Sequence, residues 1–378
     1  MAPSKRILFV VNHAGFFVSH RLAIAKAAKE QGYEVHVTAQ ADGKEHHIVA
    51  AGLHFHNWEV TRASRGLVTE GRALRSLDRV VARVKPSLMH LVTMKGMLYG
   101  GAVARLRDVP KVVFAVSGLG YVFLREGARA AMFRRALLLS FQAVMRRPNA
   151  HAVFQNDDDR GVFLDAGCLQ SRASYTMIRG SGVDLRAFPT SPIPEGNPVF
   201  MLPARMLRDK GVEEYVEAAR ILRARGVHAR FALAGGTDEN PASIPEATLR
   251  AWEAADLVDW LGHRTDMAAV LQSAFAVVLP SYREGLPKAL LEGAACGRPL
   301  VATDVPGCRD VVRDGHNGWL VPAKDAVALA EAMYKLLASP LQAAEMGRCA
   351  REDAEQRFAL PAVIDAHLAM YATLHGES

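Results

Sequence analysis

The sequence lacks several features that mark particular classes of protein. Only four of its 378 residues are cysteines, Cys168, Cys296, Cys308 and Cys349, and no two of them form a C-x-x-C pair. No segment reaches the roughly 18–20 uninterrupted apolar residues that a membrane-spanning helix needs. Residues 1–11 read as a short apolar strand without the small-residue cleavage site of a secretion signal. These absences exclude a disulfide framework and predict a cytoplasmic protein with reduced thiols.

Two further patterns are incomplete. The run Gly118-Leu-Gly120 is not a dinucleotide fingerprint, because Phe123 stands in the place of the third glycine, and this disfavours a dehydrogenase. The histidine pairs His46-His47 and His54/His56 have no carboxylate or cysteine at ligand spacing. Surface or strand positions are therefore favoured for these histidines over a metal centre.

Positive charge is concentrated in the first half of the chain. Residues 1–190 hold 27 Lys and Arg against 14 Asp and Glu, a net +13, whereas the remainder holds 19 against 25, a net −6, which together give the overall +7. Such asymmetry suggests two domains with different partners. Without a nucleic-acid-reading module, basic charge predicts only nonspecific binding, so no nucleic-acid partner is expected.

Short apolar runs alternate with helical patterns, which is typical of parallel α/β sheets. In the first half, strands are predicted over residues 6–12, 34–39, 54–58, 88–92, 112–116, 150–154 and 175–178. In the second half, they are predicted over 199–203, 230–234, 258–261, 276–279, 300–303 and 319–321. A helix over 19–32 begins at an N-cap type of residue and stops at a glycine.

The segment 188–198 reads Phe-Pro-Thr-Ser-Pro-Ile-Pro-Glu-Gly-Asn-Pro, which is too rich in proline for a helix or a strand. The sequence therefore predicts an N-terminal domain over 1–188, a linker over 189–198 and a second domain over 199–357. A C-terminal helix over 358–378 is expected to return toward the first domain. Two doubly wound sheets of this kind bind ligands beyond the carboxyl ends of their strands, in a cleft between the domains.

Two glutamates, Glu284 and Glu292, flank a predicted helix start near Leu286 or Pro287. Proline suits the first helical position, and the N–H groups of a first helical turn attract anions. A diphosphate could occupy this position, with the two carboxylates taking neighbouring hydroxyls. The alternative is one loop carboxylate and one solvated helix carboxylate.

A second candidate group, Arg205 and Lys210, directly follows the first strand of the second half. If the turn curls back, both cations can reach one point and neutralise the charge that develops on a departing phosphate. The alternative is a solvated basic loop.

Together these stretches resemble the family 4 glycosyltransferases, which are retaining enzymes of the GT-B fold with two Rossmann-like domains facing each other across a cleft. The resemblance covers nearly all of the second half, in the family's order. It lies in Ala204-Arg205…Lys210-Gly211, Leu233-Ala-Gly-Gly236, Leu261-Gly-His263, Pro280-Ser-Tyr-Arg-Glu284-Gly-Leu-Pro287…Glu292, Gly297-Arg-Pro-Leu-Val-Ala302 and Gly315-His-Asn-Gly-Trp319. The first half resembles, more loosely, a subgroup that assembles polysaccharides and lipid-linked glycans, through Val11-Asn-His-Ala-Gly-Phe-Phe-Val-Ser-His20 and Ser117-Gly-Leu-Gly-Tyr121.

The resemblance implies roles for particular residues. Arg205, Lys210 and Glu284 would form the catalytic group, with both cations on the diphosphate and Glu284 on the donor sugar. Glu292 would bind the ribose hydroxyls, and Gly15 would close over the phosphates from the first domain. The other donor-binding residues would be Gly235, Leu261, Gly262, His263, Gly285, Leu286 and Pro287. Lys95 and Ser117 are candidates for acceptor contacts; Ser117 opens the turn where the family often carries a histidine.

Retention in this family is explained by attack on the face that the phosphate leaves, the phosphate oxygen taking the acceptor's proton. No dedicated base is then needed, and we predict no cofactor and no essential metal, because Arg205 and Lys210 supply the countercharge. The run Asp157-Asp-Asp159 has a D-x-D metal pattern. It begins a helical run, however, where carboxylates favour the helix N-terminus.

Arginines flank an apolar run from Ala136 to Met145. They are Arg125, Arg129, Arg134, Arg135, Arg146 and Arg147. This pattern resembles an interfacial helix with arginines for anionic headgroups, and the alternative is a core helix with basic ends. It suggests peripheral contact with the inner face of the plasma membrane and a polyprenyl-diphosphate-linked acceptor.

The leading interpretation is a retaining transferase that uses a UDP-sugar, such as a UDP-N-acetylhexosamine, with a glycan or lipid-linked sugar as acceptor. A nonhydrolysing UDP-sugar epimerase would share the architecture, but no matching acid–base cluster is present. A non-catalytic sugar-nucleotide-binding protein is the third interpretation.

Overall fold

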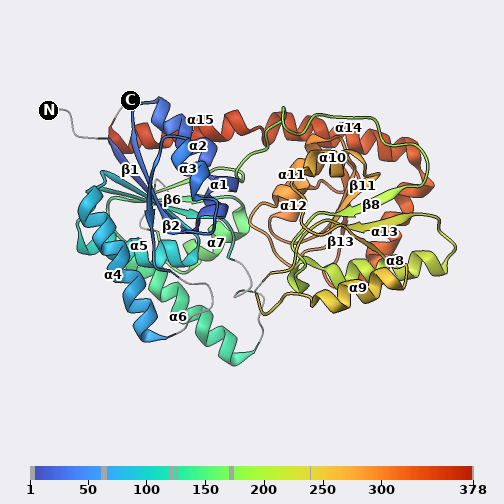
Figure 1. Cartoon of the computed structure of the whole chain (residues 1–378), viewed down its shortest axis with the longest axis horizontal. Helices are drawn as coiled ribbons and strands as arrows, with labels where there is room; N and C mark the ends of the chain where they lie inside the picture. Colours follow the sequence, from blue (N-terminus) through green and yellow to red (C-terminus); the bar gives the residue numbers. More distant parts are fainter. Residues whose placement is uncertain are drawn as a thin grey trace. The chain divides into compact units, whose positions relative to one another are not determined.

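The computed structural model describes residues 5–60, 66–119, 123, 127–169, 174–238 and 240–376. The chain forms two compact units. One contains the residues up to Ser181 together with those from Pro361 onward, and the other is Gly182–Leu360. Each unit is an open parallel sheet covered by helices (Figure 1).

The first unit contains a seven-stranded sheet in the order β3-β2-β1-β4-β5-β6-β7. The strands are β1 (Arg6–His13), β2 (Glu34–Gln40), β3 (His54–Asn57), β4 (Leu88–Val92), β5 (Lys111–Val116), β6 (Ala150–Phe154) and β7 (Tyr175–Met177). The helices are α1 (Ala14–His20), α2 (Leu22–Glu30), α3 (Glu45–Ala50), α4 (Leu67–Val84), α5 (Met94–Leu106), α6 (Ala128–Met145), α7 (Asp157–Asp165) and α15 (Leu360–His375).

The second unit contains a six-stranded sheet in the order β10-β9-β8-β11-β12-β13. The strands are β8 (Val199–Leu202), β9 (Arg230–Leu233), β10 (Asp259–Trp260), β11 (Ala276–Leu279), β12 (Leu300–Thr303) and β13 (Gly318–Val321). The helices are α8 (Val212–Ala224), α9 (Glu246–Ala254), α10 (Met267–Gln272), α11 (Lys288–Ala295), α12 (Cys308–Val311), α13 (Ala326–Ala338) and α14 (Pro340–Arg357).

Both sheets are buried on their two faces. On β1, Leu8 and Val10 pack into one cluster, with α4 and α5, and Phe9 packs into another, with α2 and α15. Because both faces are covered, the strands read as nearly continuous apolar runs rather than alternating ones. This explains why the strands could be recognised in the sequence.

All thirteen predicted strands are confirmed, with ends that differ from the observed ones by at most one residue. The predicted helix over 19–32 is wrong at its start. The chain forms α1 and α2 instead, separated by Arg21, whose φ of −132° is not helical. The side chain of His13, not Ser19, caps α1, and Gly32, with a φ of +84°, follows α2 as the predicted stop.

The first stretch of the first unit ends at Ser181, so the predicted boundary at 188 and the linker over 189–198 are displaced. The proline-rich segment lies in the second unit because the fully buried Arg298 holds it. The guanidinium of Arg298 donates to the backbone oxygens of Ser191 and Pro192, the latter at 3.0 Å, and to Ala274 O at 3.1 Å. A segment whose carbonyl oxygens accept the hydrogen bonds of a buried guanidinium is part of a folded domain, not a free linker.

The C-terminal helix α15 belongs to the first unit, although its residues follow the second unit in the sequence. The hydroxyl of Tyr371 and Nδ1 of His90 on β4 form a buried hydrogen bond of 2.6 Å. At the end of the helix, His375 Nε2 lies 3.2 Å from Ser87 Oγ. The second unit runs through Leu360 rather than the predicted residue 357.

The four cysteines are buried and unpaired. Burial raises the pKa of Cys168 and of Cys296 to about 11, which keeps both thiols protonated and unreactive near neutral pH. Within the described ranges, no helix is both long enough and apolar enough to cross a membrane.

Candidate active site

The predicted donor residues of the second unit lie where the strands end. Arg205 and Lys210 follow β8, Gly235 follows β9, Leu261–His263 follow β10, and Glu284 follows β11. These four strands are neighbours in the sheet and parallel, so their carboxyl ends share one edge. The fold therefore gathers the predicted donor group at the edge where doubly wound sheets bind ligands.

Two glycines allow the turns at this edge to approach each other closely. A Cβ atom on Gly235 would lie 1.8 Å from Ala204 O, and one on Gly211 would lie 2.1 Å from Pro280 O. Gly211 also has a φ of +71°. Any other residue would force these turns apart, so the backbone that approaches Gly235 here belongs to the neighbouring turn.

Lys210 and Glu284 form an ion pair across two turns. Lys210 Nζ lies 2.5 Å from Glu284 Oε1, and both side chains are largely buried, with 18% and 13% exposed. The same carboxylate oxygen accepts a hydrogen bond of 2.7 Å from Ser281 Oγ. The backbone is fixed as well, since Glu284 N donates to Pro306 O at 3.1 Å. A partly buried pair supported by other hydrogen bonds holds its charges in a defined position.

Arg205 does not share the carboxylate of Lys210. Its guanidinium lies 2.5 Å from Asp238 Oδ2, beyond the end of β9, and its side chain is half exposed. The hypothesis that the two cations reach one point is therefore not met in this structure, where each has its own carboxylate partner. Asp238 was missed by the sequence analysis, although an aspartate soon after the Gly235-Gly236 turn was a usable signal.

Glu292 lies in the second turn of α11, and 14% of its side chain is exposed. Its Oε1 lies 3.4 Å from Lys288 Nζ. Burial raises the pKa of Glu292 above the usual value of a glutamate, and Lys288 partly opposes that shift. The helix begins at Lys288, so Pro287 is its N-cap rather than its first residue, with a φ of −75° and a ψ of 116°.

The remaining donor candidates differ in exposure. Gly285, Leu286 and Pro287 are buried between β11 and α11. Leu261 and His263 are exposed, with the intervening Gly262 at a φ of +64°. The turn after β10 thus exposes its side chains, whereas the side chains of the turn before α11 are buried.

In the first unit, Gly15 lies in the first turn of α1. Its N–H donates to Asp42 Oδ2 at 2.8 Å, and Nδ1 of His13 lies 3.2 Å from the same oxygen. The amide predicted to face the phosphates is thus held by a carboxylate. Asp42 would have to turn away before an anion could take its place.

The acceptor candidates Lys95 and Ser117 follow β4 and β5, which are neighbouring strands. Lys95 Nζ lies 2.8 Å from Glu70 Oε1, and the hydroxyl of Tyr99 donates to the other oxygen of the same carboxylate. Burial acts to raise the pKa of Glu70, but the hydrogen bonds from Lys95 and Tyr99 outweigh it and hold the pKa below its usual value. No motif in the sequence singles out Glu70.

A strained residue marks the same edge. Thr93 lies between β4 and α5 with a φ of 68°, a conformation that a β-branched residue adopts only when its surroundings enforce it. Its hydroxyl donates to Asn12 Oδ1, at 2.6 Å, from the end of β1. Strain of this kind concentrates at functional sites, and no pattern in the sequence signalled it.

The run Asp157-Asp-Asp159 forms the first turn of α7, as the capping interpretation predicted. The N-cap is Asn156, whose side-chain oxygen accepts from Asp159 N at 2.7 Å. Among the described residues, the one group of three or more potential metal ligands lies elsewhere, at Glu34, His36 and His54.

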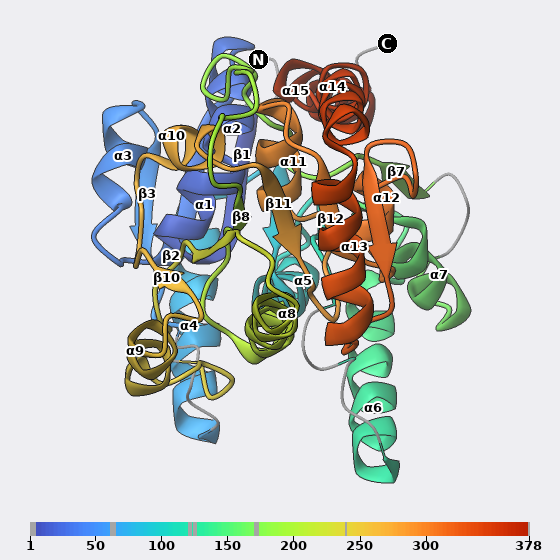
Figure 2. The ribbon, with the colours of Figure 1, turned by 90° about the vertical axis from the view of Figure 1, so that its right-hand side faces the viewer.

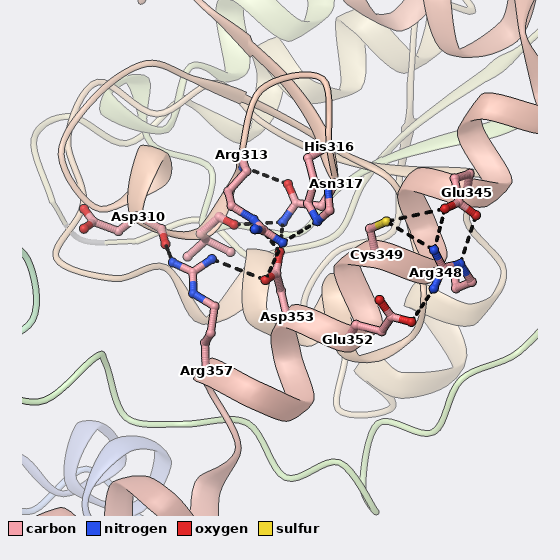
Figure 3. Close-up of polar contacts among 11 residues, drawn as sticks. Asp310, Arg313, His316, Asn317, Glu345, Arg348, Cys349, Glu352, Asp353 and Arg357 are labelled. Atoms are coloured by element: carbon pink, nitrogen blue, oxygen red, sulfur yellow. Dashed lines mark hydrogen bonds and ion pairs between the residues drawn. The ribbon is translucent and has the colours of Figure 1, made fainter.

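The motif Gly315-His-Asn-Gly-Trp319 is locked to α14 by a buried carboxylate (Figure 3). Asp353 accepts two hydrogen bonds from Arg313, at 3.0 and 2.8 Å, and one from Asn317 Nδ2, at 2.8 Å. Arg357 lies 3.5 Å from the same carboxylate. This part of the motif therefore supports the domain and does not line the strand edge that carries Lys210 and Glu284.

Two family models match the chain in tandem. Residues 6–146 match a model described as "Glycosyl transferase 4-like", and residues 197–339 match one described as "Glycosyl transferases group 1". A similar protein from Campylobacter jejuni is named N,N'-diacetylbacillosaminyl-diphospho-undecaprenol alpha-1,3-N-acetylgalactosaminyltransferase. It is 26% identical over 360 residues, which cover 92% of this chain and 93% of that protein.

Solved structures share the fold over the whole chain. Anabaena HepE, crystallised in complex with UDP and glucose, matches with a TM-score of 0.78 at 17% identity, over 98% of this chain and 100% of HepE. Sucrose-phosphate synthase from Thermosynechococcus elongatus matches with a TM-score of 0.81 at 19% identity, over 99% and 100% of the two chains. The chain therefore belongs to the family 4 glycosyltransferases and has their GT-B fold, as its motifs predict.

Proposed function

We propose that the chain is a retaining glycosyltransferase that moves a hexose, of the N-acetylhexosamine class, from a UDP-sugar to a polyprenyl-diphosphate-linked sugar during glycan assembly. The observation that carries this proposal is the Lys210–Glu284 pair, which sets a cation and a carboxylate side by side at the carboxyl edge of the sheet. Support for the donor comes from HepE, crystallised with UDP, and support for the acceptor from the name of the Campylobacter relative.

Each side chain has a distinct task in this reaction. Lys210 neutralises the negative charge that grows on the diphosphate as the sugar leaves, and Arg205 joins it by leaving Asp238. Glu284 accepts hydrogen bonds from hydroxyls of the donor sugar, and Glu292 accepts them from the ribose. The two cations supply the countercharge, so we expect transfer to survive EDTA. Activity that EDTA abolishes and magnesium restores would contradict this part.

In the transfer step, the acceptor oxygen bonds to the anomeric carbon on the face from which the phosphate oxygen departs. That phosphate oxygen takes the acceptor's proton, and UDP leaves with the electrons of the broken bond. Fixed cations and backbone donors favour this step because they stabilise charge that appears only in the transition state.

The test is a transfer assay. Nucleotide sugars are first ranked by thermal shift, because a bound ligand raises the melting temperature according to its affinity. The best donor is then incubated with a polyprenyl-diphosphate-linked sugar, and the anomeric configuration of the product is read by NMR. We expect a product that retains the α-configuration of the donor. An inverted product, isomerisation of the donor without transfer, or binding without turnover would each overturn the proposal.

The raised pKa of Glu292 predicts an acid limb for donor binding. Ribose hydroxyls need an ionised carboxylate as acceptor, so the donor's KM should rise as the pH falls through a value above the usual glutamate range near 4.3. The Glu292→Gln variant should have a KM roughly tenfold higher at neutral pH and no acid limb. Initial rates between pH 4.5 and 8 measure the KM at neutral pH and its rise at low pH. If the KM of the variant still rises at low pH, a group other than Glu292 causes that rise.

The helix α6 bears on where the acceptor is met. It reaches beyond the strands of its own sheet (Figures 1 and 2), and only Phe141 and Met145 within it are buried. Met132, Phe133 and Leu139 are 71%, 58% and 56% exposed. The core-helix alternative is thus wrong for most of its length. Arg125, the first of the arginines that flank this run in the sequence, lies outside the described residues.

Charge and shape both suit an anionic lipid surface. Residues 127–156 contain five arginines and no acidic residue. A hollow of about 390 Å³ beside α6 is lined by four apolar side chains and by the two arginines Arg134 and Arg135. Exposed apolar residues between arginines are typical of helices that lie in the membrane interface, and we propose that α6 makes this contact.

Liposome flotation at low salt tests the membrane contact. The double variant Met132→Glu/Phe133→Glu should lower the bound fraction on anionic vesicles at least about tenfold, because each acidic residue removes apolar contact and is repelled by the headgroups. The matched control is Leu341→Glu on α14 of the second unit, where the leucine is 90% exposed. Equal binding by the wild type and the double variant would remove α6 from the proposal.

A further inference from the structure

A cluster of three histidines and a glutamate lies at one edge of the first unit's sheet. It comprises Glu34 and His36 on β2 with His54 and His56 on β3, and we call it the edge cluster. The parallel register places His36 opposite His54, and β3 is the outermost strand (Figure 2). Because side chains alternate along a strand, all four residues lie on the same face of the sheet.

The side chains of the edge cluster are in contact. His36 Nε2 lies 3.0 Å from Glu34 Oε1, and His36 Nδ1 lies 3.0 Å from His56 Nε2. The His36 ring stacks on that of His54, with centroids 4.7 Å apart. One ligand atom from each of Glu34, His36 and His54 can be chosen so that all three lie within 4.8 Å of one another.

We propose that Glu34, His36 and His54 bind one Zn²⁺ ion, with water completing a tetrahedral site. Two imidazoles and a carboxylate form a ligand set that zinc uses with an open fourth position. Zinc-to-ligand distances of roughly 2.0–2.2 Å place tetrahedral ligands about 3.3–3.5 Å apart. Glu34 and His36 are already close to that separation. His54 must approach by about 1 Å, which its exposed side chain can do by rotation.

His56 acts as a positioning residue for this site. If the metal takes His36 Nε2, the ring proton stays on Nδ1, and Nδ1 already faces His56 Nε2. A metal-bound histidine that donates its other N–H to a neighbour is held in one tautomer and one orientation. The structure thus contains a ligand together with the partner that would orient it.

The one carboxylate of the cluster is shared with an arginine. Arg6 Nε lies 3.9 Å from Glu34 Oε2, which leaves Oε1 as the oxygen directed at His36.

The position of the edge cluster separates it from sugar transfer. Glu34 and His54 are the first residues of their strands, whereas ligands of doubly wound sheets bind at the opposite, carboxyl ends. The ion would tie the outermost strand β3 to β2 and thereby stabilise an exposed sheet edge. This inference does not depend on the proposed donor or acceptor.

The experiment titrates ZnCl2 into the full-length, tag-free protein after EDTA treatment and desalting, by calorimetry. We expect one high-affinity zinc per chain, and no comparable binding of Mg²⁺, which prefers oxygen ligands. His54→Ala and Glu34→Gln should each weaken zinc binding at least about tenfold, and His56→Asn by about tenfold through loss of orientation. Zinc should raise the melting temperature of the wild type but not that of His54→Ala.

The matched control is the double variant His46→Ala/His47→Ala, which removes two adjacent, exposed histidines from α3 and should leave zinc binding unchanged. Visible absorption of bound Co²⁺ gives a second readout, since its tetrahedral bands should be lost in His54→Ala. Absence of zinc binding by the wild type, unchanged affinity in His54→Ala, or loss of binding in the control would each overturn the site. Failure here would leave transfer activity untouched.

Discussion

Replacing Lys210 with alanine is expected to lower kcat by about 10²–10³-fold while raising the donor's KM less than about tenfold. In the proposed reaction, Lys210 faces the position where charge grows on the leaving diphosphate, so its contribution is expected to be larger in the transition state than in the bound donor. The side chain is fixed by Glu284 at 2.5 Å, which spares the reaction the cost of orienting it. Steady-state kinetics with a saturating acceptor measure both parameters.

The control for this prediction is Arg208→Ala. Arg208 lies in the same turn as Lys210, but it is half exposed and pairs with Glu213 at 3.1 Å. Its removal takes the same charge from the same loop, so kcat should change less than about threefold. Equal losses in the two variants would mean that the loop acts through its net charge and not through Lys210.

Replacing Asp353 with alanine is expected to cost the second unit about 2–4 kcal/mol of unfolding free energy. The carboxylate is 3% exposed and holds Arg313, Asn317 and Arg357 together (Figure 3). Without this carboxylate, the side chains of these three residues lose a shared hydrogen-bond acceptor. The two arginines are partly exposed and recover some hydration, which keeps the cost below that of a fully buried pair. Calorimetry should show the transition of the second unit lowered by about 5–15 °C.

Glu345→Ala is the matched control on the same helix. Glu345 pairs with Arg348, but both side chains are more than half exposed, at 58% and 56% (Figure 3). Water screens this pair, so its removal should shift the transition much less than that of Asp353. A shift in Asp353→Ala no larger than in the control would show that the network does not hold the 313–319 loop.

The positions of the candidate donor residues at the ends of strands could be predicted, because each position depends on immediate neighbours in the chain. Arg205 and Lys210 directly follow the buried strand β8, and Glu284 lies between β11 and a proline before a helix. Where strands alternate with helices, the sheet is parallel, and residues that follow its strands lie at the carboxyl edge of that sheet. This holds for any order of the strands. The pairing of Lys210 with Glu284 and of Arg205 with Asp238 depends on which turns are neighbours, and only strand order determines that.

The misses share one cause, which is contact between residues distant in sequence. Arg298 holds the proline-rich segment from more than one hundred residues away. Tyr371 meets His90 at a separation of 281 residues. His54 and His56 lie on a strand, as the sequence predicts, but the sequence could not show that strand pairing brings Glu34 and His36 beside them. Periodicity and spacing report on neighbours within one element and carry no information about such partners.

The sequence by itself determined the thirteen strands, the doubly wound class and the family, because burial on both faces of a parallel sheet and the turns that follow its strands leave local patterns. The sequence also predicted the return of the C-terminal helix toward the first unit, to which α15 belongs. Only the tertiary structure decided that Arg205 and Lys210 are each held by their own carboxylate, and that residues 189–198 belong to the second unit. These features arise when strands and helices pack, since packing brings together side chains whose separation in the sequence follows no period.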